Sequence, residues 1–156
     1  GIKPTSANKA EPPQDEAGVA ISEVLQAMRR HPSGATVQEK GCQALETLSL
    51  DNSNKEKVAQ KGGILVVLAA MQLHPLDAGV QAAGCAVLQR LAMNDANEES
   101  IGLNGGIPLI LNALEQHPDD LRLQEQGCWA LQNLAVHARN KKEMVQAGGV
   151  VQIISI

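Results

Sequence analysis

The sequence predicts an all-α protein built as a solenoid of helical repeats. Three dipeptides, Gly-Cys, His-Pro and Gly-Gly, each recur twice more at an interval of 43 residues, and self-similarity at a period of this length is typical of solenoids. Their first residues are Gly41, Gly84 and Gly127; His31, His74 and His117; and Gly62, Gly105 and Gly148. Hydrophobic residues make up 44% of the chain although it has one Trp and no Phe or Tyr, so aliphatic side chains must fill a core of close-packed helices.

The repeats are expected to begin near Gly18. Residues 1–17 are rich in proline, charged and small residues without an apolar period, and they predict a flexible leader or an engineered remnant. The remaining residues, 18–156, form one repeat domain. Its expected parts are a partial first repeat over 18–52, complete repeats over 53–95 and 96–138, and a truncated fourth repeat over 139–156.

Each repeat is predicted to hold three helices, of which the first is short. Its expected ranges are 54–61, 97–104 and 140–147. Residues of the types that cap helix N-termini precede the first two: Asn52 or Ser53, and Asn94 or Asp95. The inward positions are Val58, Ile101 and Met144. The Gly-Gly pair then ends the helix, because glycine adopts the left-handed conformation common at helix C-termini.

The second helix of each repeat is the most apolar. Its expected ranges are 21–30, 64–73 and 107–116, with a stub from residue 150. Two inward positions recur: Val67, Ile110 and Ile153, and Leu68, Leu111 and Ile154. Pro108 lies in the first turn, where proline is tolerated. The His-Pro pair ends the helix, since the residue before proline avoids helical geometry.

The third helix is the longest, with expected ranges 36–50, 79–93 and 122–136. Its apolar residues follow the spacing of one helical face. They are Val37, Gly41, Leu45 and Leu48; Val80, Gly84, Leu88 and Leu91; and Leu123, Gly127, Leu131 and Leu134. A glycine inside a helix costs about 1 kcal/mol relative to alanine. Its recurrence therefore predicts a close helix crossing without space for a larger side chain.

The three cysteines occupy equivalent positions, 42, 85 and 128. Stacked repeats would separate neighbouring cysteines by roughly 10 Å, whereas a disulfide needs Cα atoms within about 7 Å. We therefore interpret them as small buried thiols, neither bridged nor metal-bound. Free thiols favour a reducing compartment, the cytoplasm or the nucleus.

The period, the helix triplet and a local motif together resemble the armadillo repeat family. The stretch Gln126–Ala135, with the sequence QGCWALQNLA, is similar to the third helix of that family. Ala147–Val150 and Asn104–Leu109 are similar to the junction between its first and second helices. The resemblance covers residues 18–156. It implies a right-handed superhelix of about three and a half repeats, each with three helices in 43 residues.

The resemblance also implies a function, because the third helices of armadillo proteins line a concave groove for extended peptides. Trp129 and Asn133 occupy positions at which that family holds a peptide. An amide can bond both an N–H and a C=O of a peptide main chain, and an indole supplies a flat apolar wall with a polar edge. The alternative interpretation is that Trp129 only packs against a neighbouring repeat.

In this family, nuclear-import adaptors hold basic peptides with a row of such Trp and Asn residues. The equivalent positions in the other repeats of this chain differ, so a basic import-signal peptide is not the expected ligand. They are Gln43 with Thr47, and Ala86 with Arg90. Arg90 would favour an acidic group in the middle of the groove. Lys40 and Gln126 extend the same helical face, and Gly79, Ala83 and Ala86 predict a shallow centre in which a partner side chain could settle.

Other functional classes have little support in the sequence. A net charge of −4 disfavours a nucleic-acid partner, and no apolar run reaches the roughly 18 residues of a membrane span. Histidines placed one repeat apart cannot converge on a metal, so we expect them to cap the last carbonyls of the second helices. We find no catalytic constellation and predict neither an enzyme nor a cofactor.

The expected function is a non-enzymatic module that binds an extended peptide or a partner protein. The alternative is an architectural spacer or self-associating segment of a larger multidomain scaffold or signalling protein. That alternative rests on the apolar C-terminal residues 150–156, which would leave an uncovered end able to join another copy.

Overall fold

Nine α-helices and no strand make up the part of the chain that the computed structural model describes, residues 14–148. They are α1 Glu16–Arg30, α2 Ala35–Leu48, α3 Asn52–Gln60, α4 Gly63–Leu73, α5 Ala78–Leu91, α6 Asp95–Leu103, α7 Gly106–Gln116, α8 Leu121–Leu134 and α9 Ala138–Gln146. None of these helices is long and apolar enough to cross a membrane. The predicted all-α class is confirmed.

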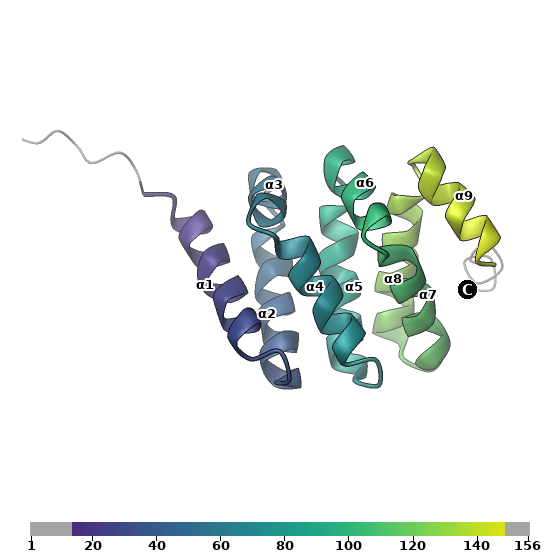
Figure 1. Cartoon of the computed structure of the whole chain (residues 1–156), viewed down its shortest axis with the longest axis horizontal. Coiled ribbons are helices and arrows are strands. Elements are labelled where there is room, and N and C mark those ends of the chain that lie inside the picture. The colour runs from purple at the N-terminus through teal and green to yellow at the C-terminus, as the bar shows by residue number, and fades with distance from the viewer. Residues whose placement is uncertain (1–13, 149–156) are drawn as a thin grey trace, which may run out of the picture.

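The helices lie in three rows (Figure 1). One row contains α1, α4 and α7, the row behind it contains α2, α5 and α8, and α3, α6 and α9 lie along the upper edge of the view. In the second row α5 packs against both α2 and α8. The helices of this row begin at residues 35, 78 and 121, an interval of 43. The expected helix ranges agree with the observed ones to within about two residues, except at the start of α1.

The helix ends follow local side-chain chemistry. Gly62, Gly105 and Gly148 have φ values of 80°, 84° and 75°, so the expected left-handed glycines are confirmed. Asn94 caps α6 as predicted, accepting a hydrogen bond from the N–H of Asn97 at 3.0 Å. The prediction of Asn52 or Ser53 as the cap of α3 is wrong. Asp51 has the extended backbone that a cap requires, and its carboxylate accepts from the N–H of Ser53 at 2.8 Å.

The first helix begins earlier than expected. Asp15 caps α1 by accepting a hydrogen bond from the N–H of Gly18 at 3.0 Å, and the helix starts at Glu16. Residues 16 and 17 of the predicted leader are therefore helical. Residues 1–13 lie outside the described residues, as do the predicted stub from residue 150 and the inward positions Ile153 and Ile154.

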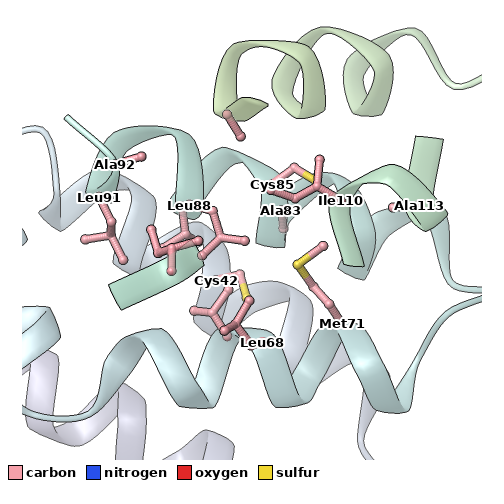
Figure 2. Close-up of a cluster of buried hydrophobic side chains, with 14 of the residues drawn as sticks. Cys42, Leu68, Met71, Ala83, Cys85, Leu88, Leu91, Ala92, Ile110 and Ala113 are labelled. Carbon is pink, nitrogen blue, oxygen red and sulfur yellow. The ribbon is translucent and has the colours of Figure 1, made fainter. Parts of the chain in front are cut away.

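One continuous apolar core runs between the rows. Figure 2 shows part of this core, where labelled side chains of α2, α4, α5 and α7 meet, among them Cys42, Met71, Cys85 and Ile110. The predicted inward residues are buried in every described repeat, with two exceptions. Val37 and Leu48 on α2 are only half-buried. Among the described residues α2 is the first helix of its row, so that it has a neighbour in the row on one side only.

The glycines inside the second-row helices lie at close helix crossings. A Cβ atom added at Gly41 would lie 2.5 Å from Cγ of Met28, and one added at Gly84 would lie 2.6 Å from Cγ of Met71. At Gly127 it would lie 2.6 Å from Cδ2 of Leu114. These distances are shorter than any ordinary carbon contact, so the predicted lack of space for a larger side chain is confirmed.

Candidate interaction surface

The predicted contact residues all lie on the second row of helices, at the spacing of three or four that places residues on one helical side. We call this surface the α2–α5–α8 face. It comprises Lys40, Gln43 and Thr47 on α2, Ala86 and Arg90 on α5, and Gln126, Trp129 and Asn133 on α8.

Trp129 and Asn133 lie one turn apart on α8. The indole is 46% exposed, which is high for so large an apolar side chain. Nδ2 of Asn133 donates a hydrogen bond to the main-chain oxygen of Gln89 on α5, at 2.8 Å. This bond fixes the amide between two helices. The amide of Asn133 also has a second N–H and an oxygen, which can form further hydrogen bonds.

The centre of the face differs from the prediction. Ala86 and Ala83 are fully buried and Ala82 is 3% exposed, because α5 is flanked by α2 and α8 along its length. The prediction that Ala86 touches a partner is therefore wrong for this conformation. Of the three residues expected to form a shallow centre, Gly79 is half-buried and only Ala83 and Ala86 are fully buried.

Arg90 is also placed differently from the expectation. Its Nε lies 3.8 Å from Oε1 of Glu46 on α2, and Nη2 of Arg122 on α8 donates a hydrogen bond to Oε2 of the same carboxylate at 3.4 Å. The charge of Arg90 is thus partly offset within the chain. The sequence prediction omitted Glu46 because it lies 44 residues before Arg90, and nothing in a linear pattern pairs the two.

The α2 end of the face is polar. Nε2 of Gln43 donates to Oε1 of Glu39 at 3.3 Å, and the hydroxyl of Thr47 donates to the main-chain oxygen of Gln43 at 3.1 Å. Lys40 is exposed, as are Gln43 and Thr47, whereas Gln126 on α8 is half-buried. All the predicted contact residues except Ala86 therefore present at least part of their side chain to solvent.

The histidines cap the second helices as predicted, but through their main chain. His31, His74 and His117 are the C-cap residues of α1, α4 and α7, and their N–H groups donate to the oxygens of Ala27, Ala70 and Ala113. Two of the imidazole rings make a different contact. Nε2 of His74 donates to the main-chain oxygen of Pro32 and Nε2 of His117 donates to that of Pro75, both at 2.8 Å. A carbonyl oxygen only accepts, so Nε2 carries the proton in each ring. The histidines do not cap their own helices with their side chains. They join each His-Pro turn to the one before it.

A row of glutamines adds side-chain capping at the same helix ends. Nε2 of Gln81 donates to the main-chain oxygens of Met71 and His74, both at 2.8 Å. Gln38 and Gln124 make the equivalent pairs of bonds at the ends of α1 and α7. The signal that could have identified them is the recurrence of glutamine at positions 38, 81 and 124, at the same interval of 43.

Two asparagines on the third row connect successive helices in a similar way. Nδ2 of Asn97 on α6 donates to the main-chain oxygen of Lys55 on α3 at 3.1 Å, and Nδ2 of Asn140 on α9 donates to that of Glu98 on α6 at 3.2 Å. Both side chains are buried. The recurrence of Asn54, Asn97 and Asn140 in the sequence is thus explained, for the last two, by a bond to the preceding helix of the row.

The three cysteines are free and buried, as predicted. Burial raises the pKa of the Cys42 thiol to about 12, and it raises the pKa of Cys85 and of Cys128 as well. The thiols are therefore protonated and unreactive near neutral pH. Within residues 14–148, no group of three or more His, Cys, Asp or Glu side chains could hold a metal ion.

The chain matches none of the protein-family models, curated proteins or solved structures with which it was compared.

Proposed function

We propose that this protein is a non-enzymatic interaction module that binds an extended peptide, or an extended segment of a partner protein, on the α2–α5–α8 face. The proposal includes the architecture: armadillo-type repeats stacked in a right-handed solenoid, of which about three and a half lie in this sequence. Support comes from the 43-residue interval between the helices of the second row and from the Trp-Ala-Leu-Gln-Asn-Leu-Ala motif on α8.

One observation carries the functional part of the proposal: the single tryptophan is 46% exposed on the same side of α8 as Asn133. Tryptophan is concentrated among the residues that dominate binding energy at protein interfaces. When a partner side chain covers a half-exposed indole, apolar surface is removed from water, and this favours binding. The adjacent amide is fixed in position by its bond to Gln89, so that its remaining hydrogen-bonding groups lose little freedom on binding.

The size of the face limits the ligand. Three helices packed at roughly 10 Å intervals span about 30 Å. An extended peptide advances about 3.3 Å per residue, so about nine residues cross the face. Such a contact buries less area than a standard protein interface, and we expect modest affinity from these repeats alone.

The test uses a library of immobilised nine-residue peptides and the whole chain. Trp129→Ala combined with Asn133→Ala is expected to weaken binding of the selected peptides. Leu103→Ala combined with Asn104→Ala is the matched control, because it also removes one exposed apolar residue and one amide that is bonded to a main-chain oxygen, but at the end of α6. Emission from Trp129 should shift as each selected peptide is added. Peptides that bind equally to both double variants, without changing the emission, would contradict the proposal.

A further inference from the structure

Two arginines converge on one carboxylate at the α2–α5–α8 face. Glu46 comes from α2, Arg90 from α5 and Arg122 from α8. The side chain of Glu46 is 20% exposed, while those of Arg90 and Arg122 are 32% and 47% exposed. The three charges sum to +1. They connect all three helices of the row, and Arg90 is the charged side chain that α5 contributes.

The carboxylate of Glu46 satisfies neither arginine fully. Charge-assisted N–H···O bonds are usually about 2.7–2.9 Å long, whereas Glu46 lies 3.4 Å from Nη2 of Arg122 and 3.8 Å from Nε of Arg90. Nε of Arg90 is enclosed and has no hydrogen-bond acceptor among the described residues. A buried donor without an acceptor is costly, which favours a rearrangement that brings Glu46 closer to Arg90.

We propose that Arg122 binds an acidic side chain of the partner. In the free chain Glu46 occupies the guanidinium of Arg122, and the partner's carboxylate displaces it. The inference rests on the proposed function and names the class of ligand: an extended peptide that presents Asp or Glu to the face. When a partner carboxylate takes the guanidinium of Arg122, the carboxylate of Glu46 is free to close the 3.8 Å gap to Nε of Arg90. One bond replaces another, so releasing Arg122 leaves no charge unpaired.

The geometry favours Arg122 over Arg90 as the ligand-binding arginine. Arg122 is the more exposed of the two, and its planar guanidinium can hold a carboxylate with two parallel bonds. Exposed charges elsewhere on these helices have both signs, as Lys40 and Glu125 show. Recognition of an acidic side chain therefore depends on Arg122 itself rather than on a generally positive surface.

Three pools of nine-residue peptides test the inference, each with apolar residues at alternate positions and with Glu, Gln or Lys at the others. Alternation places the polar side chains on one side of an extended peptide. Each pool carries a fluorescent label, and its anisotropy reports binding to the full chain at low and high salt. The variants are Arg122→Gln, Glu46→Gln and, as the control, Arg139→Gln, an exposed arginine on α9.

The wild-type chain is expected to bind the Glu pool more tightly than the Gln pool, and the Gln pool more tightly than the Lys pool. Arg122→Gln should weaken binding of the Glu pool about fivefold, as for the loss of one exposed ion pair, and leave binding of the Gln pool unchanged. Glu46→Gln should strengthen binding of the Glu pool about threefold, because it removes the carboxylate that competes for Arg122 within the chain. Added salt should reduce both effects.

Separate outcomes overturn the two proposals. Equal binding of the Glu and Gln pools, equal losses from Arg122→Gln and Arg139→Gln, or weaker Glu-pool binding by Glu46→Gln would each refute the role of Arg122 while leaving peptide binding intact. Failure of all three pools to bind the wild-type chain would refute the proposed function and this inference together. Thermal unfolding followed by circular dichroism verifies that every variant is folded.

Discussion

The imidazole Nε2 of His117 donates a hydrogen bond to the main-chain oxygen of Pro75, 42 residues earlier, at 2.8 Å. His74 makes the same contact with Pro32. Each of these bonds joins the turn that follows α4 or α7 to the turn that follows the preceding helix of the same row. They explain why histidine and proline recur together in the sequence: the ring of one pair binds the main chain of the other.

His117→Ala is expected to lower the free energy of unfolding by about 1 kcal/mol, the net contribution of one hydrogen bond at an accessible site. The measurement is the midpoint of urea unfolding. His31→Ala is the matched control, since no His-Pro pair precedes it in the sequence. Equal losses from the two variants would mean that the Pro75 contact contributes nothing to stability.

Gln81→Leu should be among the most destabilising single changes at a polar side chain. Gln81 is 2% exposed, and its amide serves the main-chain oxygens of both Met71 and His74. Leucine has a similar size but would leave the enclosed oxygen of Met71 without a donor, while the oxygen of His74 would keep only the N–H of Asp77, at a cost of about 2 kcal/mol. Gln124→Leu is the comparison, because Gln124 is half-buried and water can replace its bonds. Urea unfolding that showed the larger loss for Gln124→Leu would contradict this argument.

Gly84→Ala tests the close crossing of α4 and α5. The added methyl group would lie 2.6 Å from Cγ of Met71, and the resulting strain should outweigh the helix propensity of alanine by about 1–2 kcal/mol. At Gly79, on the same helix, the three atoms nearest to the added methyl group belong to the far end of the flexible Glu39 side chain, which can move aside, so Gly79→Ala should be neutral or stabilising. A double-mutant cycle with Met71→Ala measures the coupling directly. Absence of coupling between positions 84 and 71 would exclude the proposed clash.

The buried thiol of Cys42 should make stability fall at alkaline pH. Its pKa is raised by burial, from an ordinary value of 9.0 to about 12. The unfolded chain therefore loses its thiol proton at a lower pH than the folded chain, and the stabilisation present below pH 9 is lost as pH rises from 9 towards 12. Between pH 8 and pH 10 the wild-type chain should lose about 1.4 kcal/mol more than Cys42→Ala. Identical losses in urea unfolding would show that the thiol ionises equally in both states.

The sequence is sufficient to predict the helices, most of their ends and the core, because these depend on local patterns that recur three times. Gly62 and Gly105 end their helices as expected, and Val58, Ile101 and Met144 point inwards. The burial of Ala86 could not be predicted, since it depends on how closely α2 and α8 flank α5 rather than on any pattern within α5.

The candidate face was predictable in position but not in its electrostatics. The spacing of Trp129 and Asn133 places them on one side of α8. The meeting of Glu46 with Arg122 joins residues 76 apart, and only the relative tilt of three helices brings them together. Helix periodicity describes which residues share a side of one helix, whereas such a pairing also depends on the angles between helices.

The bonds from His117 to Pro75, from Asn97 to Lys55 and from Asn140 to Glu98 all reach back 42 residues. A duplicated copy of residues 53–95 would therefore find correct acceptors before it and correct donors after it. An inserted segment of another length would leave these groups facing the wrong neighbours. Such a chain can gain or lose whole units by recombination, and its α2–α5–α8 face can lengthen without a redesign of the helices that already exist.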